Sequence, residues 1–194
     1  ILERSEPVTH QGDHYQLPYT GHGALGLGKP LKSITHPLRS DVPIFLASLG
    51  HRNVALTAEI ADGWLPTFWS PSQAAAIWGD DLAAGFGRSE DVGRRDRFRI
   101  VPMVPTVIAD DLDAARNAAK PSLALYVGGM GAKGKNFYHD LATRYGYEEA
   151  ADTIQELWLD GRQGEAMAAV PDELVDEVCL VGPKERVAER LGRW

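Results

Sequence analysis

The pattern of apolar positions along the chain changes from irregular to regular near residue 43. Three later segments are mostly apolar, and the last of them is rich in Val and Ile, which predicts strands. The first of them is a continuous apolar run, as expected of a strand buried on both faces. The predicted strands are 43–48, 64–68 and 99–109, with a weaker apolar segment at 177–181.

Helices are predicted between and after these strands, because apolar residues there recur at helical spacing. They cover 53–61, 72–85, 147–160, 171–176 and 183–194. A further helix opens at Asp111 or Asp113, and Pro121 is expected to interrupt or restart it. Residues 128–131 are expected to form a glycine-rich loop after it. Ser70 and Pro71 are expected to cap and begin the helix over 72–85.

This alternation of strands and helices predicts βαβ units around a parallel sheet, and so an α/β fold. A complete (β/α)8 barrel needs eight strands and about 250 residues. The 194 residues here contain three clear strands, which indicates either a small open α/β domain or about half of a barrel. Because Ile1–Arg4 resembles the last turn of a helix, we expect the sequence to be a piece of a longer protein.

The region before residue 43 has a different character. Residues 8–17 form a predicted hairpin around Gln11-Gly12-Asp13, in which Gly12 is expected to supply the positive φ of the turn. Residues 19–37 are rich in Gly, His and Pro and are expected to form a long loop. We expect residues 1–194 to be a single domain from which 19–37 is a loop excursion.

Composition excludes several classes of function. Hydrophobic residues make up 44% and charged residues 24%, which is typical of a globular protein, and the net charge is -7. A nucleic-acid partner is not expected, because binding a phosphate backbone needs a basic face. No apolar run reaches the ~18 residues of a membrane span. With one cysteine, Cys179, no internal disulfide is possible, and a cytoplasmic location is expected.

Two nucleotide-binding patterns occur in the loop over 19–37, but their context does not fit either. Residues 21–26 spell G-x-G-x-x-G, yet no buried strand precedes them and no helix follows. Residues 23–29 spell G-x-x-x-x-G-K, but Pro30 stands where a P-loop needs Ser or Thr. A surface loop is the better interpretation.

Metal and nucleophile motifs are weak. No histidine pair has H-x-x-x-H spacing on a predicted helix, so no metal site is expected. Ser48 and Ser70 lie outside any G-x-S-x-G motif, and Cys179 sits in an apolar segment. The sequence therefore identifies no catalytic residue.

The most informative stretch follows the first strand and opens the next helix. Backbone N–H groups at the start of a helix are unpaired, and the helix dipole favours an anion there. Gly50 permits close approach, while Ser48 and Asn53 add hydrogen-bonding side chains and Arg52 adds charge. A phosphate group is the natural ligand, although a plain βα loop with a glycine turn fits the pattern equally well. The residues of this loop are Ala47, Ser48, Leu49, Gly50, His51, Arg52 and Asn53.

Several motifs, in their order and spacing, resemble the luciferase-like monooxygenase family, and within it the oxidoreductases that use the deazaflavin coenzyme F420. The similarity covers nearly all of the chain. The motifs are Glu6–Pro18, Gly26–Lys32, Pro43–Gly50, Asn53–Pro66, Tyr126–Gly131, Asn136–Tyr138 and Pro171–Asp176.

This resemblance implies a (β/α)8 barrel, here a partial one, with the coenzyme at the carboxyl ends of the strands. It implies hydride transfer between coenzyme F420 (8-hydroxy-5-deazaflavin) and a small organic substrate, and a homodimer. The Ala47–Asn53 loop then corresponds to the coenzyme-phosphate site. The implied substrate-pocket residues are Phe68, Trp69, Gly129, Met130, Phe137 and Tyr138.

The sequence also departs from the family. The family's early strands, which carry most of the ring-binding and proton-handling groups, are not matched, and neither is its last strand. The catalytic acid or base is therefore unidentified. His51 stands where many relatives have a small residue or proline.

Other functions stay open at this point. On the same fold, the protein could be an FMN-dependent monooxygenase or a flavin-binding protein without turnover. A barrel enzyme acting on phosphorylated metabolites would use the same phosphate loop.

Overall fold

The computed structural model describes all 194 residues and divides them into two units, 1–43 and 44–194. In the first unit, β1 (His10–Gln11) and β2 (Gln16–Leu17) form the predicted antiparallel hairpin. The φ of Gly12 is not positive, contrary to prediction, and the turn closes through its N–H, which donates to the Tyr15 carbonyl. The expected helical turn at Ile1–Arg4 is also wrong, because these residues form no helix.

The rest of the first unit is largely irregular. Val8 pairs with Leu31 in an isolated antiparallel bridge, and no other strand or helix occurs between residues 18 and 43. Most side chains in this unit are exposed, so few apolar contacts fix its conformation. The proposal that the whole chain is one domain stays a prediction.

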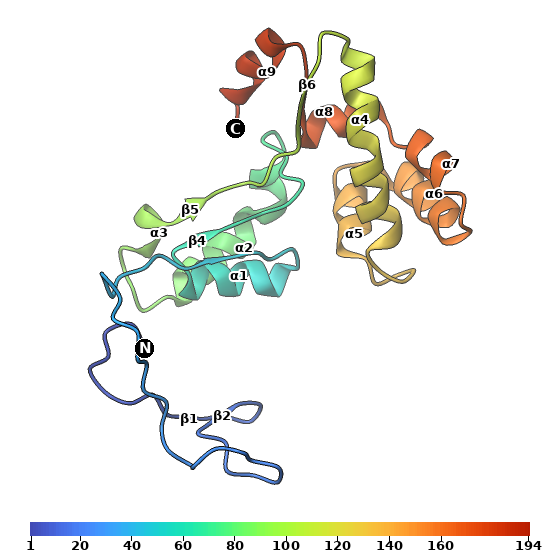
Figure 1. Cartoon of the computed structure of the whole chain (residues 1–194). Coiled ribbons are helices and arrows are strands. Elements are labelled where there is room, and N and C mark those ends of the chain that lie inside the picture. The colour runs from blue at the N-terminus through green and yellow to red at the C-terminus, as the bar shows by residue number, and fades with distance from the viewer. The chain divides into compact units, whose positions relative to one another are not determined.

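In the second unit, β3 (Phe45–Leu46), β4 (Gly63–Trp64) and β5 (Arg99–Ile100) form a parallel sheet in the order β3-β4-β5 (Figure 1). Central β4 is buried, whereas β3 lies at an edge and is half-buried. The expectation that the first strand is buried on both faces is therefore wrong. Only a strand with neighbours on both sides and helices on both faces has that environment.

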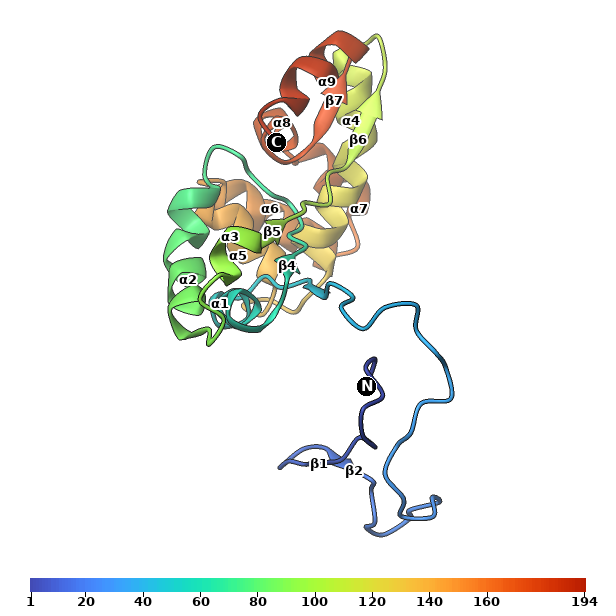
Figure 2. The ribbon, with the colours of Figure 1, turned by 90° about the vertical axis from the view of Figure 1, so that its left-hand side faces the viewer.

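The predicted strand over 99–109 is two strands. Its first part is β5, and its second part is β6 (Thr106–Ile108), which pairs in parallel with β7 (Leu180–Gly182) (Figure 2). Pro102 and Pro105 lie between β5 and β6, and a proline has no N–H to donate to a neighbouring strand. The chain therefore changes its pairing partner where these prolines occur.

Helices α1 (His51–Ile60) and α2 (Ala74–Arg88) pack against each other. Gly85 makes this close approach possible, because a Cβ there would lie 2.1 Å from the carbonyl oxygen of Ala55. Ser70 does not cap α2 and Pro71 does not begin it, contrary to prediction, because the N-cap residue of α2 is Gln73. The Ser70 hydroxyl accepts from the N–H of Gln73 at 3.1 Å, so it closes the turn that precedes the helix.

The remaining helices include three that the sequence did not predict, α3, α5 and α7. Their bounds, with those of the predicted helices, are α3 (Arg94–Arg97), α4 (Leu112–Ala124), a π-helix (Leu125–Gly129), α5 (Phe137–Arg144), α6 (Glu148–Leu159), α7 (Gln163–Ala168), α8 (Asp172–Val178) and α9 (Lys184–Leu191). No helix has the length and apolar character needed to cross a bilayer.

Helix α4 begins at Leu112, and its N-cap residue is Asp111 and not Asp113. The Asp111 carboxylate accepts from the N–H groups of Asp113 and Ala114, at 2.9 and 3.1 Å, which satisfies two of the helix's unpaired donors. Pro121 neither interrupts nor restarts the helix, contrary to expectation, and α4 runs on into the π-helix. The predicted glycine-rich loop over 128–131 is also wrong in part, because Gly128 and Gly129 belong to that π-helix.

Candidate functional site

The loop between β3 and α1 presents an uncapped helix end. Gly50 is the N-cap residue of α1, no side chain caps the helix, and its first turn contains no acidic residue. The first N–H to bond within the helix is that of Val54, which donates to the Gly50 carbonyl at 2.9 Å. The N–H groups before it are free to bind a ligand, and the positive end of the helix dipole favours an anion there.

Hydrogen bonds hold this loop against the core. The indole Nε1 of buried Trp64 donates to the Ser48 carbonyl at 2.9 Å. Thr57 donates its hydroxyl proton to the Asn53 carbonyl at 2.7 Å, and its oxygen lies 2.8 Å from the Ser48 hydroxyl. Since Thr57 has one hydroxyl proton, Ser48 is the donor in that second contact. The Ser48 hydroxyl is thus engaged within the protein, and anion binding falls to the backbone and Asn53.

A cleft of about 210 Å³ opens beside this helix end. It combines residues of the predicted phosphate loop with two of the predicted pocket aromatics and two residues after β4. Its lining is Ala47, Ser48, Leu49, Gly50, Asn53, Leu65, Thr67, Phe137 and Tyr138. Phosphate-loop and pocket residues predicted separately therefore share one cavity.

His51 and Arg52 of the predicted loop do not line this cleft. The Nδ1 atom of His51 lies 2.5 Å from the Asp81 carboxylate, and its ring is tilted against that of Trp78 at 5.7 Å. Arg52 is exposed. Both residues still contribute backbone N–H groups at the start of α1.

The other predicted pocket residues lie outside the cleft. Phe68 is buried, with an unusual positive φ of 51°. Trp69 packs edge-on against Trp64 at 5.6 Å and borders a separate groove along α2. Gly129 packs against the Trp158 indole, and Met130 is 52% exposed.

An aromatic cluster supports the wall of the cleft. The ring of Tyr138 meets those of Tyr126 and Phe68 edge to face, at 4.7 and 5.7 Å. The Tyr145 hydroxyl donates to the Phe68 carbonyl at 2.7 Å. Phe68 therefore contacts Tyr138 at the start of α5 and Tyr145 at its C-cap. Burial, with a smaller effect from Tyr126, raises the pKa of Tyr138, so its hydroxyl keeps its proton at neutral pH.

Sequence reasoning missed Leu65 and Thr67, although a signal for them was available. Both follow β4, the neighbour of β3, and the carboxyl ends of adjacent parallel strands meet at the same edge of a sheet. The residues after the second strand were therefore predictable neighbours of Ser48.

A larger cavity of about 460 Å³ contains none of the predicted site residues. Three carboxylates line it together with two arginines, Arg190 and Arg193. Glu177 accepts from the Ser72 hydroxyl at 2.5 Å and also from Ser70, while Asp176 pairs with Arg116 and Arg186. Because much of its polar lining is already engaged within the protein, we assign the candidate site to the smaller cleft.

Comparison with known proteins gives one family. The sequence profile described as luciferase-like monooxygenase matches residues 1–194. A Mycobacterium tuberculosis protein, provisionally named a coenzyme F420-dependent oxidoreductase, is 48% identical over all 194 residues, which make up 56% of its length.

Solved structures show the same fold. The coenzyme F420-dependent tetrahydromethanopterin reductase of Methanopyrus kandleri matches 99% of the chain with a TM-score of 0.71 and 21% identity, over 50% of its own chain. An F420-dependent secondary alcohol dehydrogenase, solved with an F420-acetone adduct, matches 99% with a TM-score of 0.63 and 15% identity, over 48% of its chain. The chain thus has the fold of part of a luciferase-like barrel and spans about half the length of these relatives.

Proposed function

The chain belongs to the luciferase-like monooxygenase family, and on this basis we propose that it is part of a coenzyme F420-dependent oxidoreductase. The proposed reaction moves a hydride between the deazaflavin and a small organic substrate. The name of the relative that is 48% identical supports the choice of coenzyme.

The uncapped start of α1 is the observation that carries this proposal. A phosphate group in the cleft would accept from the free N–H groups of the first turn, with the Asn53 side chain beside it. Gly50 leaves room for it, because the nearest atom to a Cβ at this position is Cε1 of Phe137, at 3.4 Å. The residues present therefore fit the phosphate end of the coenzyme.

The size of the cleft limits what it holds. At about 210 Å³ it is smaller than a complete pocket for a drug-sized ligand, which measures roughly 300–1,000 Å³. We therefore assign to this cleft the phosphate end of the coenzyme and not its ring. When bound, the deazaflavin supplies the hydride donor or acceptor, whereas the residues of this chain bind and orient it.

An FMN-dependent monooxygenase is the second candidate, and the description of the matched family favours it. FMN also carries a phosphate group, so the same helix end would serve both coenzymes. We further propose a homodimer, as the family resemblance implies, which sedimentation would test. A cytoplasmic location agrees with Cys179, a buried free thiol.

The substitution Gly50→Val tests the phosphate assignment. Valine methyl groups would enter the cleft beside Phe137, so we expect affinity for coenzyme F420 to fall at least tenfold (~1.4 kcal/mol). The matched control is Gly87→Val, because a Cβ at exposed Gly87 of α2 meets nothing within 4 Å. Fluorescence titration measures affinity, and far-UV circular dichroism checks the helices. Unchanged affinity in Gly50→Val would contradict the assignment.

A further inference from the structure

We propose that Asn136 is a positioning residue for the coenzyme cleft: its buried amide fixes where α5 begins, and with it the aromatic wall formed by Phe137 and Tyr138. This inference rests on the proposed function, because it concerns the same cleft. It assigns a role to a residue that does not line the cleft itself.

The Asn136 side chain is 1% exposed and uses its whole hydrogen-bonding capacity. Its Nδ2 donates to the carbonyls of Tyr126 and Val127, at 3.0 and 2.8 Å. Its Oδ1 accepts from the N–H groups of Tyr138 and His139, at 2.9 and 3.3 Å. Two donors and two acceptor sites are all that an amide side chain offers.

Not every buried side-chain amide in this protein has all of its hydrogen bonds. Gln155 on α6 is also buried, at 3% exposed, yet its Nε2 has no hydrogen-bond partner. The geometry around Asn136 is therefore specific to its position between two elements.

The carbonyl partners of Asn136 need a donor from outside their helix. Tyr126 and Val127 belong to the π-helix that ends α4, and the last carbonyls of a helix have no partner within it. That helix end is itself fixed, because Gly128 and Gly129 lie so close to Trp158 that a Cβ on either would clash. Asn136 thus binds to a rigid support.

On its other side, Asn136 caps α5. The Oδ1 bonds to Tyr138 and His139 satisfy two of the unpaired N–H groups at the start of that helix. One amide therefore joins the end of the π-helix to the first turn of α5. Because this amide bonds to both elements, it determines where α5 starts and in which direction it runs.

The cleft depends on this starting point. Phe137 and Tyr138 are the first two residues of α5, and both line the cleft opposite the phosphate loop. The Phe137 ring lies beside Gly50, and the Tyr138 ring packs on Tyr126 of the π-helix. If α5 began elsewhere, both aromatic side chains would leave their places in the wall of the cleft.

Asn136→Asp is the sharpest test because it changes one functional group at constant shape. The aspartate keeps the oxygen that caps α5, but its second oxygen faces the carbonyls of Tyr126 and Val127 where Nδ2 donated. The two hydrogen bonds to the π-helix are therefore lost, while the cap on α5 is retained. Asn117→Asp, on an exposed position of α4, is the matched control for the added charge. Asn136→Ser is the second variant. Serine keeps an oxygen that can cap α5, but it places no negative charge beside the two carbonyls.

We measure coenzyme F420 affinity by fluorescence titration and tyrosine packing by near-UV circular dichroism, at a temperature where every variant is fully folded. We expect Asn136→Asp and Asn136→Ser to bind at least tenfold more weakly and to lose near-UV signal with the far-UV spectrum intact. Loss of stability alone would not lower the affinity of fully folded protein. Wild-type affinity in both variants would overturn the inference.

Failure of the proposed function gives a different result. If the wild-type chain does not bind coenzyme F420, the proposed function fails, and the near-UV comparison still decides whether Asn136 positions the two aromatic residues. A near-UV spectrum unchanged in both variants would overturn the positioning role independently of the coenzyme.

Discussion

Gly128 illustrates at the residue scale how the absence of one side chain fixes a local structure. A Cβ at this position would lie 2.7 Å from the Cβ of Trp158 and 3.1 Å from the Ile154 carbonyl oxygen. Glycine therefore lets the π-helix lie directly on α6. The sequence pattern Gly128-Gly129 predicted a loop instead, because glycine is common in loops and only the neighbouring helix explains its use here.

Gly128→Ala should destabilise the protein by about 1–3 kcal/mol, since the added methyl overpacks a rigid contact. Gly164→Ala is the matched control, because Gly164 lies on α7 and a Cβ there meets nothing within 4 Å. The control should be neutral or stabilising by up to ~1 kcal/mol, from the better helix propensity of alanine. Urea unfolding measures both changes, and equal effects of the two substitutions would refute this packing argument.

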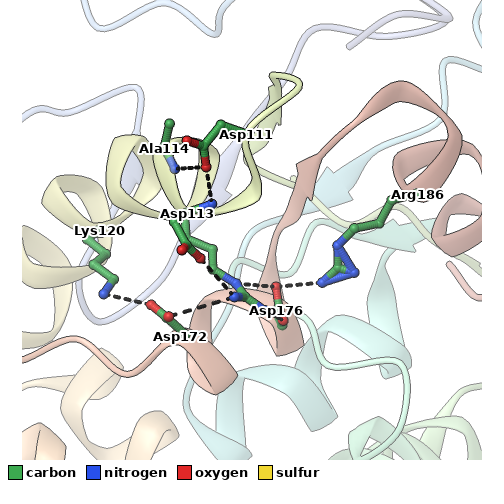
Figure 3. A network of polar contacts seen from close by, with 8 residues as sticks. Asp111, Asp113, Ala114, Lys120, Asp172, Asp176 and Arg186 are labelled. Atoms are coloured by element: carbon green, nitrogen blue, oxygen red, sulfur yellow. Dashed lines mark hydrogen bonds and ion pairs between the residues drawn. The ribbon is translucent and has the colours of Figure 1, made fainter.

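At the scale of elements, an ion-pair network joins α4, α8 and α9. Asp176 of α8 lies 2.6 Å from Arg116 of α4 and 2.8 Å from Arg186 of α9. Lys120 lies 2.7 Å from Asp172, and Figure 3 shows Asp172 and Asp176 of α8 facing their basic partners. The network connects three helices that all contact β7.

The Asp176 carboxyl should make stability depend on pH. Burial acts to raise its pKa, but hydrogen bonds from Arg116 and Arg186 and their charges outweigh burial and lower it. A lowered folded-state pKa contributes stability above the unfolded value of about 4, and that stability is lost as pH falls through the folded value.

Asp176→Asn should therefore cost about 1–2 kcal/mol at pH 7, a magnitude that allows for its 23% exposure. The difference from wild type should shrink below about pH 4. Asp113→Asn is the control, because Asp113 pairs with the same arginine but is 80% exposed, so its effect should stay within about 0.5 kcal/mol. Thermal unfolding at pH 7 and pH 3 checks the sign, and a difference that grows in acid would contradict it.

Element positions were predictable to different degrees for physical reasons. The helix of 148–159 was predicted within a residue because its apolar stripe is regular. The split of residues 99–109 was missed, since pairing with two different strands is a tertiary property. Helix α5 was missed because it has eight residues and its main signal is the Asn136 cap.

For the whole molecule, the order of motifs and the alternation of strands and helices predicted the family and the fold class, and both are confirmed. The candidate site was predicted less completely. The strand–glycine–helix pattern placed the phosphate loop, but nothing local distinguishes Phe137, which lines the cleft, from Phe68, which is buried behind it. That distinction depends on how α5 packs against the β4 loop.

The central claim is that this chain binds the phosphate end of coenzyme F420. Native mass spectrometry of the 21.2 kDa chain, mixed with equal amounts of coenzyme F420 and FMN, tests it most directly. The account predicts one coenzyme F420 molecule per chain, in preference to FMN, and a weaker adduct in Gly50→Val. A chain that carries neither coenzyme, or that carries FMN alone, would contradict it.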